Sequence, residues 1–189
     1  MLVIDDDEFD IAVKSLRNAG FRDAPWSYFS VVDPQSFEDE DLKGTHEDGA
    51  LQYRNLDDNS MRFEFPLGSK VEIRAILLRS SYTHLSLRDT PDQRFTKSGN
   101  IYYPDKELLL ESFAKTVVRE PSMNIWTGDL GMWAISYAYS WLKIDDTALD
   151  SISDEEAKAW FNKRIRRSEG GLDRTTFTKR VGKKYNTSQ

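Results

Sequence analysis

The chain has 189 residues, of which 39% are hydrophobic and 31% charged, and its formal net charge is −6. This length allows one core of ordinary size, and the absence of cysteine excludes a disulfide framework, a thiolate zinc site, a catalytic cysteine and an iron–sulfur cluster. The apolar runs are too short to span a membrane and the first residues are acidic. We therefore expect an intracellular protein, cytoplasmic or nuclear, that does not bind membranes.

The charge is unevenly distributed along the chain. From Lys158 onward ten Lys or Arg stand against two acids, a net of +8, and the preceding residues hold 16 bases against 30 acids, a net of −14. A chain with an acidic body and a basic end can bind to itself, to an acidic partner or to a polyanion.

The N-terminal part is predicted to contain a helix and a strand. Apolar residues at helical spacing predict a helix over 7–19, and Gly20 is placed to end it in the left-handed conformation. An aromatic and β-branched run predicts a strand over 26–32. Residues 35–59 are acidic with little apolar periodicity, and this pattern predicts a long surface segment.

A β-hairpin is predicted next. Met61, Phe63 and Phe65 alternate with charged residues, a turn follows over 66–70, and a strand over 71–78 begins half-exposed and ends with both faces buried. We expect residues 82–87 to continue the sheet.

A loop over 88–99 and a short strand over 100–103 are predicted to lead into the helical half, a helix pair around which the chain is organised. Pro104 and the acids after it favour a helix over 103–119, and a turn at 120–124 connects it to a helix over 129–142. The second helix is apolar nearly all round, a pattern that predicts burial.

The C-terminal part is predicted to begin with a capped helix. A short acidic connection over 144–150 precedes Ser153 and Glu156, which have the spacing of a capping box and predict a helix over 154–167. We expect a core domain over 1–150, with the helix and basic arm of 151–189 docked on it or extending from it. The predicted class is α+β, with a mixed or antiparallel sheet of four to five strands packed against the helical half.

Several short sequence words resemble a known superfamily. Ala19-Gly20-Phe21 ends a helix, Val71 to Leu78 forms the second hairpin strand, and Tyr102-Tyr103-Pro104-Asp105 opens the helical half. This order resembles the later part of minimal nucleotidyltransferase domains and a group of uncharacterised fungal proteins. The resemblance implies a degenerate nucleotidyltransferase-like fold over about residues 8–142.

The Gly68-Ser69 turn corresponds to the turn that holds the triphosphate in that superfamily. The magnesium-binding carboxylates that should follow it have no matching positions, because the corresponding stretch is Leu78-Arg79-Ser80-Ser81-Tyr82. The resemblance therefore implies a fold without the usual active site and without a cofactor.

Three residues are the remaining catalytic candidates. Glu64 and Glu72 lie on neighbouring predicted strands and can share a face, where they would form a relocated carboxylate pair for Mg²⁺. His84 can act as a general base if a carboxylate orients it.

Two other clusters have structural and functional interpretations. The acids Asp5, Asp6, Asp7, Glu8 and Asp10 can chelate a divalent cation, but helix capping explains them, and we predict no metal site. The aromatic residues of the second helix can line a ligand pocket, but we expect them to pack in the core, with Trp126 in the preceding loop and partly exposed.

The basic end is the candidate binding surface. Its spacing resembles a bipartite nuclear signal and also suits phosphate contacts, whereas the alternative is a solvated helix face and a tail paired with the acidic body. The candidate binding residues are Lys163, Arg164, Arg166, Arg167, Lys179, Arg180, Lys183 and Lys184.

The sequence therefore predicts a non-catalytic intracellular protein that acts by binding an as yet unknown protein partner. The alternatives are a nucleotidyltransferase-type enzyme with relocated carboxylates, which would need Mg²⁺, and nucleic-acid binding by the basic C-terminal segment.

Overall fold

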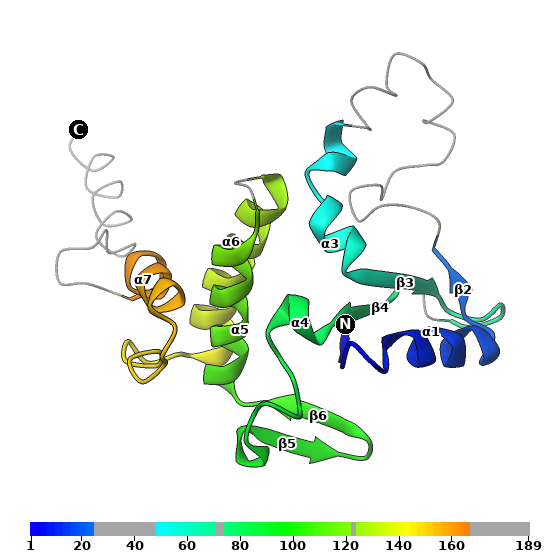
Figure 1. The fold of residues 1–189 in the computed structure, drawn as a ribbon, viewed down its shortest axis with the longest axis horizontal. Helices are drawn as coiled ribbons and strands as arrows, with labels where there is room; N and C mark the ends of the chain where they lie inside the picture. Colours follow the sequence, from blue (N-terminus) through cyan, green and yellow to red (C-terminus); the bar gives the residue numbers. More distant parts are fainter. Residues whose placement is uncertain (25–47, 71–73, 122–123, 167–189) are drawn as a thin grey trace, which may run out of the picture.

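The computed structural model describes residues 1–24, 48–70, 74–121 and 124–166. The predicted α+β class is confirmed (Figure 1). The elements in chain order are β1 (Leu2–Ile4), α1 (Phe9–Asn18), β2 (Arg22–Asp23), α3 (Arg54–Asp58), β3 (Ser60–Glu64), β4 (Ala75–Arg79), α4 (Ser80–Thr83), η2 (Asp92–Arg94), β5 (Phe95–Ser98), β6 (Ile101–Pro104), α5 (Lys106–Arg119), α6 (Ile125–Tyr137), the π-helical η3 (Ala138–Leu142) and α7 (Glu155–Arg164).

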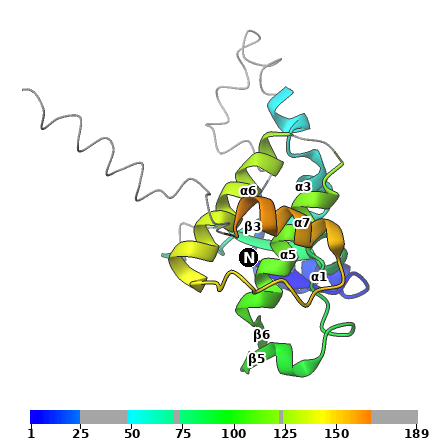
Figure 2. The same cartoon turned by 90° about the vertical axis from the view of Figure 1, so that its left-hand side faces the viewer.

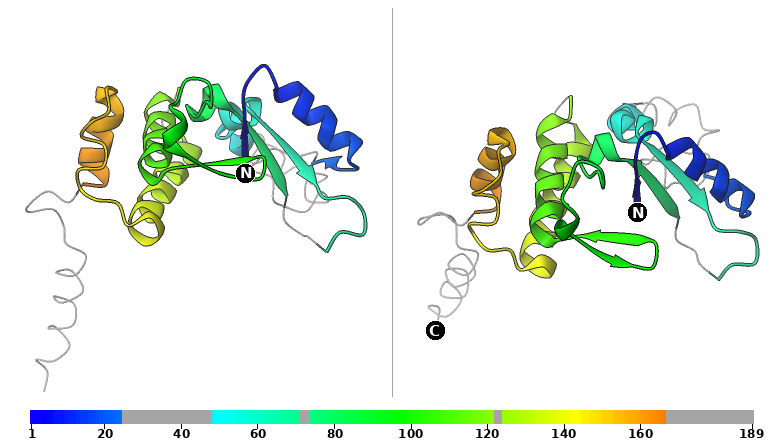
Figure 3. Two further views of the ribbon diagram at one scale, coloured as in Figure 1. Left: turned by 90° about the horizontal axis from the view of Figure 1, so that it is seen from below. Right: turned by 60° about the horizontal axis from the view of Figure 1, so that its bottom comes forward.

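The molecule has a sheet half and a helical half. Figure 1 shows the main sheet with α1 on the right, α5, α6 and α7 on the left, and the short α4 between the two halves. Seen from the left-hand side, α7 lies in front of α5 (Figure 2). The β5–β6 hairpin forms a sheet of its own, and the right-hand view of Figure 3 shows it apart from the main sheet.

The main sheet has four strands in the order β1-β4-β3-β2. The predicted hairpin is confirmed, because β3 and β4 pair antiparallel with Phe63 opposite Ala75. Strand β1 was not predicted; it pairs parallel to β4, with Leu2 opposite Leu77. Because β1 holds only three residues, it is too short to show a periodic pattern.

Two predictions for residues 82–99 are wrong. Ser80–Thr83 is a helical turn and not a continuation of the sheet, and Asp6 holds its start through Oδ1, which accepts bonds from Ser80 Oγ and Ser81 N at 3.0 Å each. Residues 95–98 form a strand of the β5–β6 hairpin and not a loop. Gly99, with φ +60°, supplies the left-handed residue of its two-residue turn.

Opposite faces of the sheet pack against different helices. On one face, Phe9 and Val13 of α1 pack on Phe63 and Leu77. The predicted end of α1 is confirmed, since Gly20 has φ +88°.

On the other face, Leu78 packs against Tyr53 and Leu56, both buried. The described end of the predicted surface segment 35–59 therefore contributes to the core. The same cluster includes Tyr82 and Val117, so it joins the sheet to the helical half.

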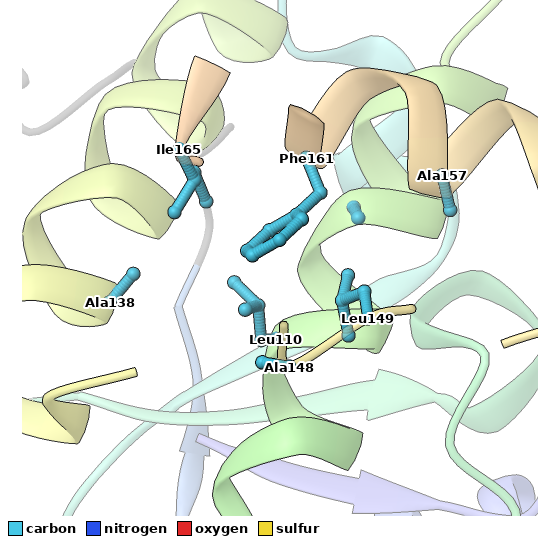
Figure 4. Packing of buried hydrophobic residues seen from close by; sticks show 8 residues of the cluster. Leu110, Ala138, Ala148, Leu149, Ala157, Phe161 and Ile165 are labelled. Carbon is cyan, nitrogen blue, oxygen red and sulfur yellow. The ribbon is translucent and has the colours of Figure 1, made fainter. Parts of the chain in front are cut away.

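The helical half has its own cluster. Leu110, Leu149 and Phe161 are fully buried between α5, the connection after η3, and α7, as Figure 4 shows. Helix α5 begins at Lys106 and not at the predicted residue 103, because Tyr103 and Pro104 belong to β6 and Asp105 is the N-cap. The Asp105 side chain accepts a bond from Leu108 N at 2.7 Å.

Helix α7 is confirmed, with a different cap. Asp154, one residue after Ser153, accepts the bond from Ala157 N at 3.0 Å and also pairs with Arg119 at the end of α5. Helix α7 therefore docks on the core. The predicted strand 26–32, Glu72 and residues 167–189 lie outside the described residues.

Candidate functional site

The catalytic candidates do not form a site in the described part of the chain. Glu64 lies directly opposite Arg22 on β2 and pairs with it at 2.9 Å. Its predicted companion, Glu72, lies outside the described residues, so the proposed carboxylate pair stays a prediction.

His84 lies at the end of α4, beside two cationic side chains. It ends α4 in the left-handed region with φ 54°, and burial together with the nearby charges of Arg119 and Lys115 lowers its pKa. Within the described residues no carboxylate makes a hydrogen bond to its ring, so no partner orients the imidazole. A neutral histidine fixed beside two cations is better explained as part of the α4–α5 packing.

The acidic N-terminus has a structural role. Arg88 pairs with Asp7 at 2.7 Å and lies within 4 Å of Asp5 and Glu8. Bonds from Ser81 and Ser80 lower the pKa of Asp6, whose carboxylate fixes α4. Across the described ranges, no group of three or more His, Asp or Glu is arranged to hold a metal ion.

Three of the eight basic candidate binding residues lie in the described part of the chain. Lys163 and Arg164 are exposed at the end of α7. Arg166 instead donates to the Asp146 carbonyl oxygen at 2.7 Å and pairs with Asp150, so it holds the connection after η3 in place. The other five, Arg167, Lys179, Arg180, Lys183 and Lys184, lie outside the described residues.

The predicted burial of the second helix is wrong. Helix α6 and η3 form one continuous helical stretch, and six large hydrophobic side chains on it are exposed, namely Ile125, Met132, Trp133, Tyr137, Tyr139 and Trp141, the last of them 78% exposed. We call the surface formed by Trp133, Tyr137 and Trp141 the aromatic face. These residues recur at i, i+4 and i+8, the spacing of neighbours on one helix face. A contiguous exposed apolar surface of this kind marks an interaction site.

The prediction for Trp126 is also wrong, in the opposite direction. Trp126 is only 4% exposed, and its indole Nε1 donates to Tyr82 Oη at 2.6 Å and to Glu120 Oε1 at 3.2 Å. The Tyr82 hydroxyl in turn donates to Glu120 Oε1 at 2.7 Å. Burial, together with the bond to Glu120, raises the pKa of Tyr82, so its hydroxyl keeps its proton.

This network gives hydrogen-bond donors to only one of the two carboxylate oxygens of Glu120. Its Oε2 atom is buried and has no hydrogen-bond partner in the described part of the chain. An unsatisfied buried carboxylate oxygen is unfavourable by about 1–3 kcal/mol.

Glu120 lines a pocket between α5, α6 and α7. The pocket has a volume of about 590 Å³, within the usual range for small-ligand sites. Its walls include Val117 of α5, Met132 and Ile135 of α6, and Trp160 of α7.

Sequence reasoning missed the aromatic face and Glu120 for identifiable reasons. A helix with apolar residues on every side has no polar stripe to indicate which side meets solvent. Glu120 lies in a predicted turn, and nothing in its neighbours indicates that Tyr82, 38 positions earlier, donates to it. Only the excess of aromatic residues between 126 and 141 was a usable signal.

Comparison of the chain with protein-family models, curated proteins and solved structures found no match. In the described residues, no helix has the length and apolar character needed to cross a membrane. The function is therefore argued from the site alone.

Proposed function

We propose that this protein is a non-catalytic binding module that docks a basic amphipathic helix of a partner protein on the aromatic face. The observation that carries the proposal is the exposure of two tryptophans, Trp133 and Trp141, on one helix face. Aromatic residues are the commonest binding hot spots, and amphipathic helices bind through apolar surfaces of this kind.

The net negative charge of the helical half favours a partner with basic side chains. From Glu120 to Arg166, eight Asp or Glu stand against five Lys or Arg, a net of −3. Two of these acids, Asp150 and Asp154, already pair with Arg166 and Arg119, and Lys158 pairs with Glu155. A partner helix with Lys or Arg beside its apolar face matches this field, whereas an acidic helix is repelled.

The proposal extends to the fold family of the sheet half and to the cellular location of the protein. We propose that the sheet half is a nucleotidyltransferase-like domain without its usual active site, and that the protein acts in the cytoplasm or the nucleus. Pure protein incubated with Mg²⁺ or Mn²⁺ and labelled nucleoside triphosphates should transfer no label. Label on protein, RNA or a small acceptor would establish the enzyme alternative.

Nucleic-acid binding stays a separate prediction, because most of its candidate residues lie outside the described ranges.

Docking can be tested with two designed helical peptides of about 18 residues, or five turns. One combines leucine with lysine, and the other combines leucine with glutamate. We expect the full-length protein to bind the Leu–Lys peptide and not the Leu–Glu peptide by calorimetry. The double variant Trp133→Ala/Trp141→Ala should weaken binding by at least about thirtyfold, because loss of even one buried tryptophan anchor costs about 2 kcal/mol or more.

The matched control is Ile11→Ala. Ile11 is 64% exposed but lies on α1, in the sheet half, so its removal should leave the affinity unchanged. Equal binding of both peptides, or equal weakening by the control, contradicts the proposal. A wild-type dimer that the double variant converts to a monomer in sedimentation also contradicts it, because the face would then belong to a second copy of the chain.

A further inference from the structure

The last described residues of the chain are held against η3. The Tyr139 hydroxyl on η3 donates to the carbonyl oxygen of Ile165, at the end of α7. Arg166 donates to the carbonyl oxygen of Asp146 and pairs with Asp150, in the connection after η3. The described chain therefore ends against the helical stretch that carries the aromatic face.

The sequence after this point has the two features that we propose for a partner of the aromatic face. Residues 167–189 lie outside the described residues, but their sequence is informative. Phe177, Val181 and Tyr185 recur at intervals of four, the same intervals that separate the three residues of the aromatic face. Such intervals place side chains on one face of a helix. Five Lys or Arg and no acid stand within residues 174–185, so the apolar pattern lies in a basic setting.

Charge favours contact between this segment and the aromatic face. Residues 167–189 hold six Lys or Arg against two acids, a net of +4. Asp129 lies one turn before the aromatic face on α6, and Asp145 and Asp146 follow η3. The stretch that these acids delimit holds three Asp against one Lys, a net of −2. The opposite charges of the segment and of this stretch attract each other.

The segment is long enough to reach the face. Tyr139 lies two positions after Tyr137, on the opposite side of the helix, so a chain that leaves beside Tyr139 must pass around η3. A helix is about 10 Å across, and the face extends over eight positions, or about 12 Å. The ten residues 167–176 span up to about 33 Å when extended. Phe177 can therefore reach any point of the face.

We propose that residues 174–185 dock on the aromatic face of their own molecule and compete there with the partner helix. This inference rests on the proposed function, because it names a regulator of the same surface. A segment joined to the chain has a high effective concentration at the face, so a partner has to displace it. The apparent affinity for the partner is reduced according to the fraction of molecules whose face is free.

The test compares the full-length protein with the triple variant Phe177→Ala/Val181→Ala/Tyr185→Ala. This variant removes the apolar side of the segment and keeps every charge. We expect it to bind the Leu–Lys peptide about tenfold more tightly than the wild type by calorimetry, the change for a face that is free in about one wild-type molecule in ten. The matched control is Thr175→Ala/Thr178→Ala/Asn186→Ala, which changes three polar residues of the same segment and should leave the affinity unchanged.

A second measurement needs no added partner. Docking of the segment covers Trp133 and Trp141, so their indole N–H resonances should differ between the wild type and the triple variant, and should match the wild type in the control. A synthetic peptide of residues 167–189, added to the triple variant, should move these resonances toward their wild-type positions. The difference should not depend on protein concentration, because the contact lies within one molecule.

The two proposals can be told apart. Equal affinity of the wild type and the triple variant for the Leu–Lys peptide, together with identical Trp133 and Trp141 resonances, would overturn the inference and leave partner docking intact. A resonance difference that grows with protein concentration would also overturn it, because the segment would then dock on a second copy. If the Leu–Lys peptide does not bind the triple variant, whose face is free, partner docking fails, and the resonance comparison still decides whether the segment covers the face.

Discussion

Trp126 and Trp141 lie on the same helical stretch, yet one is 4% exposed and the other 78%. Their positions along the stretch explain the difference. Trp126 lies in the first turn of α6, where the central cluster with Tyr53 and Tyr82 covers it, whereas Trp141 lies 15 positions later, in η3, and belongs to none of the buried clusters. Burial of Trp126 requires a partner for its indole N–H, and Tyr82 and Glu120 supply it.

The hydroxyl of Tyr82 is the link in this network. Tyr82→Phe removes the donor to Glu120 and leaves its buried carboxylate with only the longer bond from Trp126. We expect the free energy of unfolding, measured by urea denaturation at neutral pH, to fall by about 1–3 kcal/mol. Tyr103→Phe is the matched control, because Tyr103 is half exposed on β6 and should change the value by less than about 0.5 kcal/mol. Equal effects of the two variants would rule out this role for Tyr82.

The exposure of single aromatic residues was not predictable from the sequence. Periodicity indicates the helical phase only when one side is polar, and residues 130–142 contain no charged residue. The apolar partners that cover one side lie on α5 and α7, and the sequence does not indicate their arrangement around α6.

At the scale of the element, the start of α5 depends on one carboxylate. Asp105 caps the helix through Leu108 N and also accepts a bond from Arg94 Nη2 at 3.0 Å. These contacts link the β5–β6 hairpin region to the central helix. A two-stranded hairpin is marginal by itself, so this link stabilises it.

Asp105→Ala should therefore destabilise the protein by about 1 kcal/mol at neutral pH, the usual effect of losing an N-cap. The bond from Arg94 lowers the pKa of Asp105. The folded state thus favours the ionised form, and the contribution is present above the ordinary carboxyl pKa of about 4 and lost as pH falls through the lowered value. Urea denaturation of both proteins should give a difference that shrinks below about pH 4. Asp89→Ala, at an exposed turn, should change little, and a difference that grows in acid would contradict the assignment.

Replacing a glycine of α6 by alanine should instead stabilise the protein. Gly128→Ala should raise the thermal midpoint, with a gain of up to about 1 kcal/mol, because alanine is the better helix former and the site is open. Gly20→Ala should lower the midpoint, because φ +88° is strained for any residue with a Cβ. Destabilisation by Gly128→Ala would mean that the fold itself requires that glycine.

The helices and the central hairpin were predictable because their signals are local. Alternation predicted β3, the spacing of apolar residues predicted α1 and α5, and the capping-box spacing of Ser153 and Glu156 predicted α7 to within a residue of its start. Strand β1 was not predictable, because its partner β4 lies more than 70 positions later and three residues show no period. Helix α4 was missed for a related reason: its start is held by Asp6, which is distant in sequence.

At the scale of the whole molecule, the central cluster makes the two halves one structure. Leu78 of the sheet, Tyr82 of α4 and Val117 of α5 pack in the same cluster. The helical half is covered on two sides, by the sheet half and by α7, and its third side carries the aromatic face. A core built in this way leaves one large apolar surface in solvent, which is the arrangement expected of a protein that completes its packing with a partner.

The indole N–H resonances of the full-length protein test this claim most directly, because its five tryptophans differ in their environments. Addition of the Leu–Lys peptide should shift the resonances of Trp133 and Trp141 most, and that of Trp126 less, since Trp126 is buried and bonded to Tyr82 and meets only the edge-on ring of Trp133. Peptide binding that leaves Trp133 and Trp141 unmoved would contradict the account.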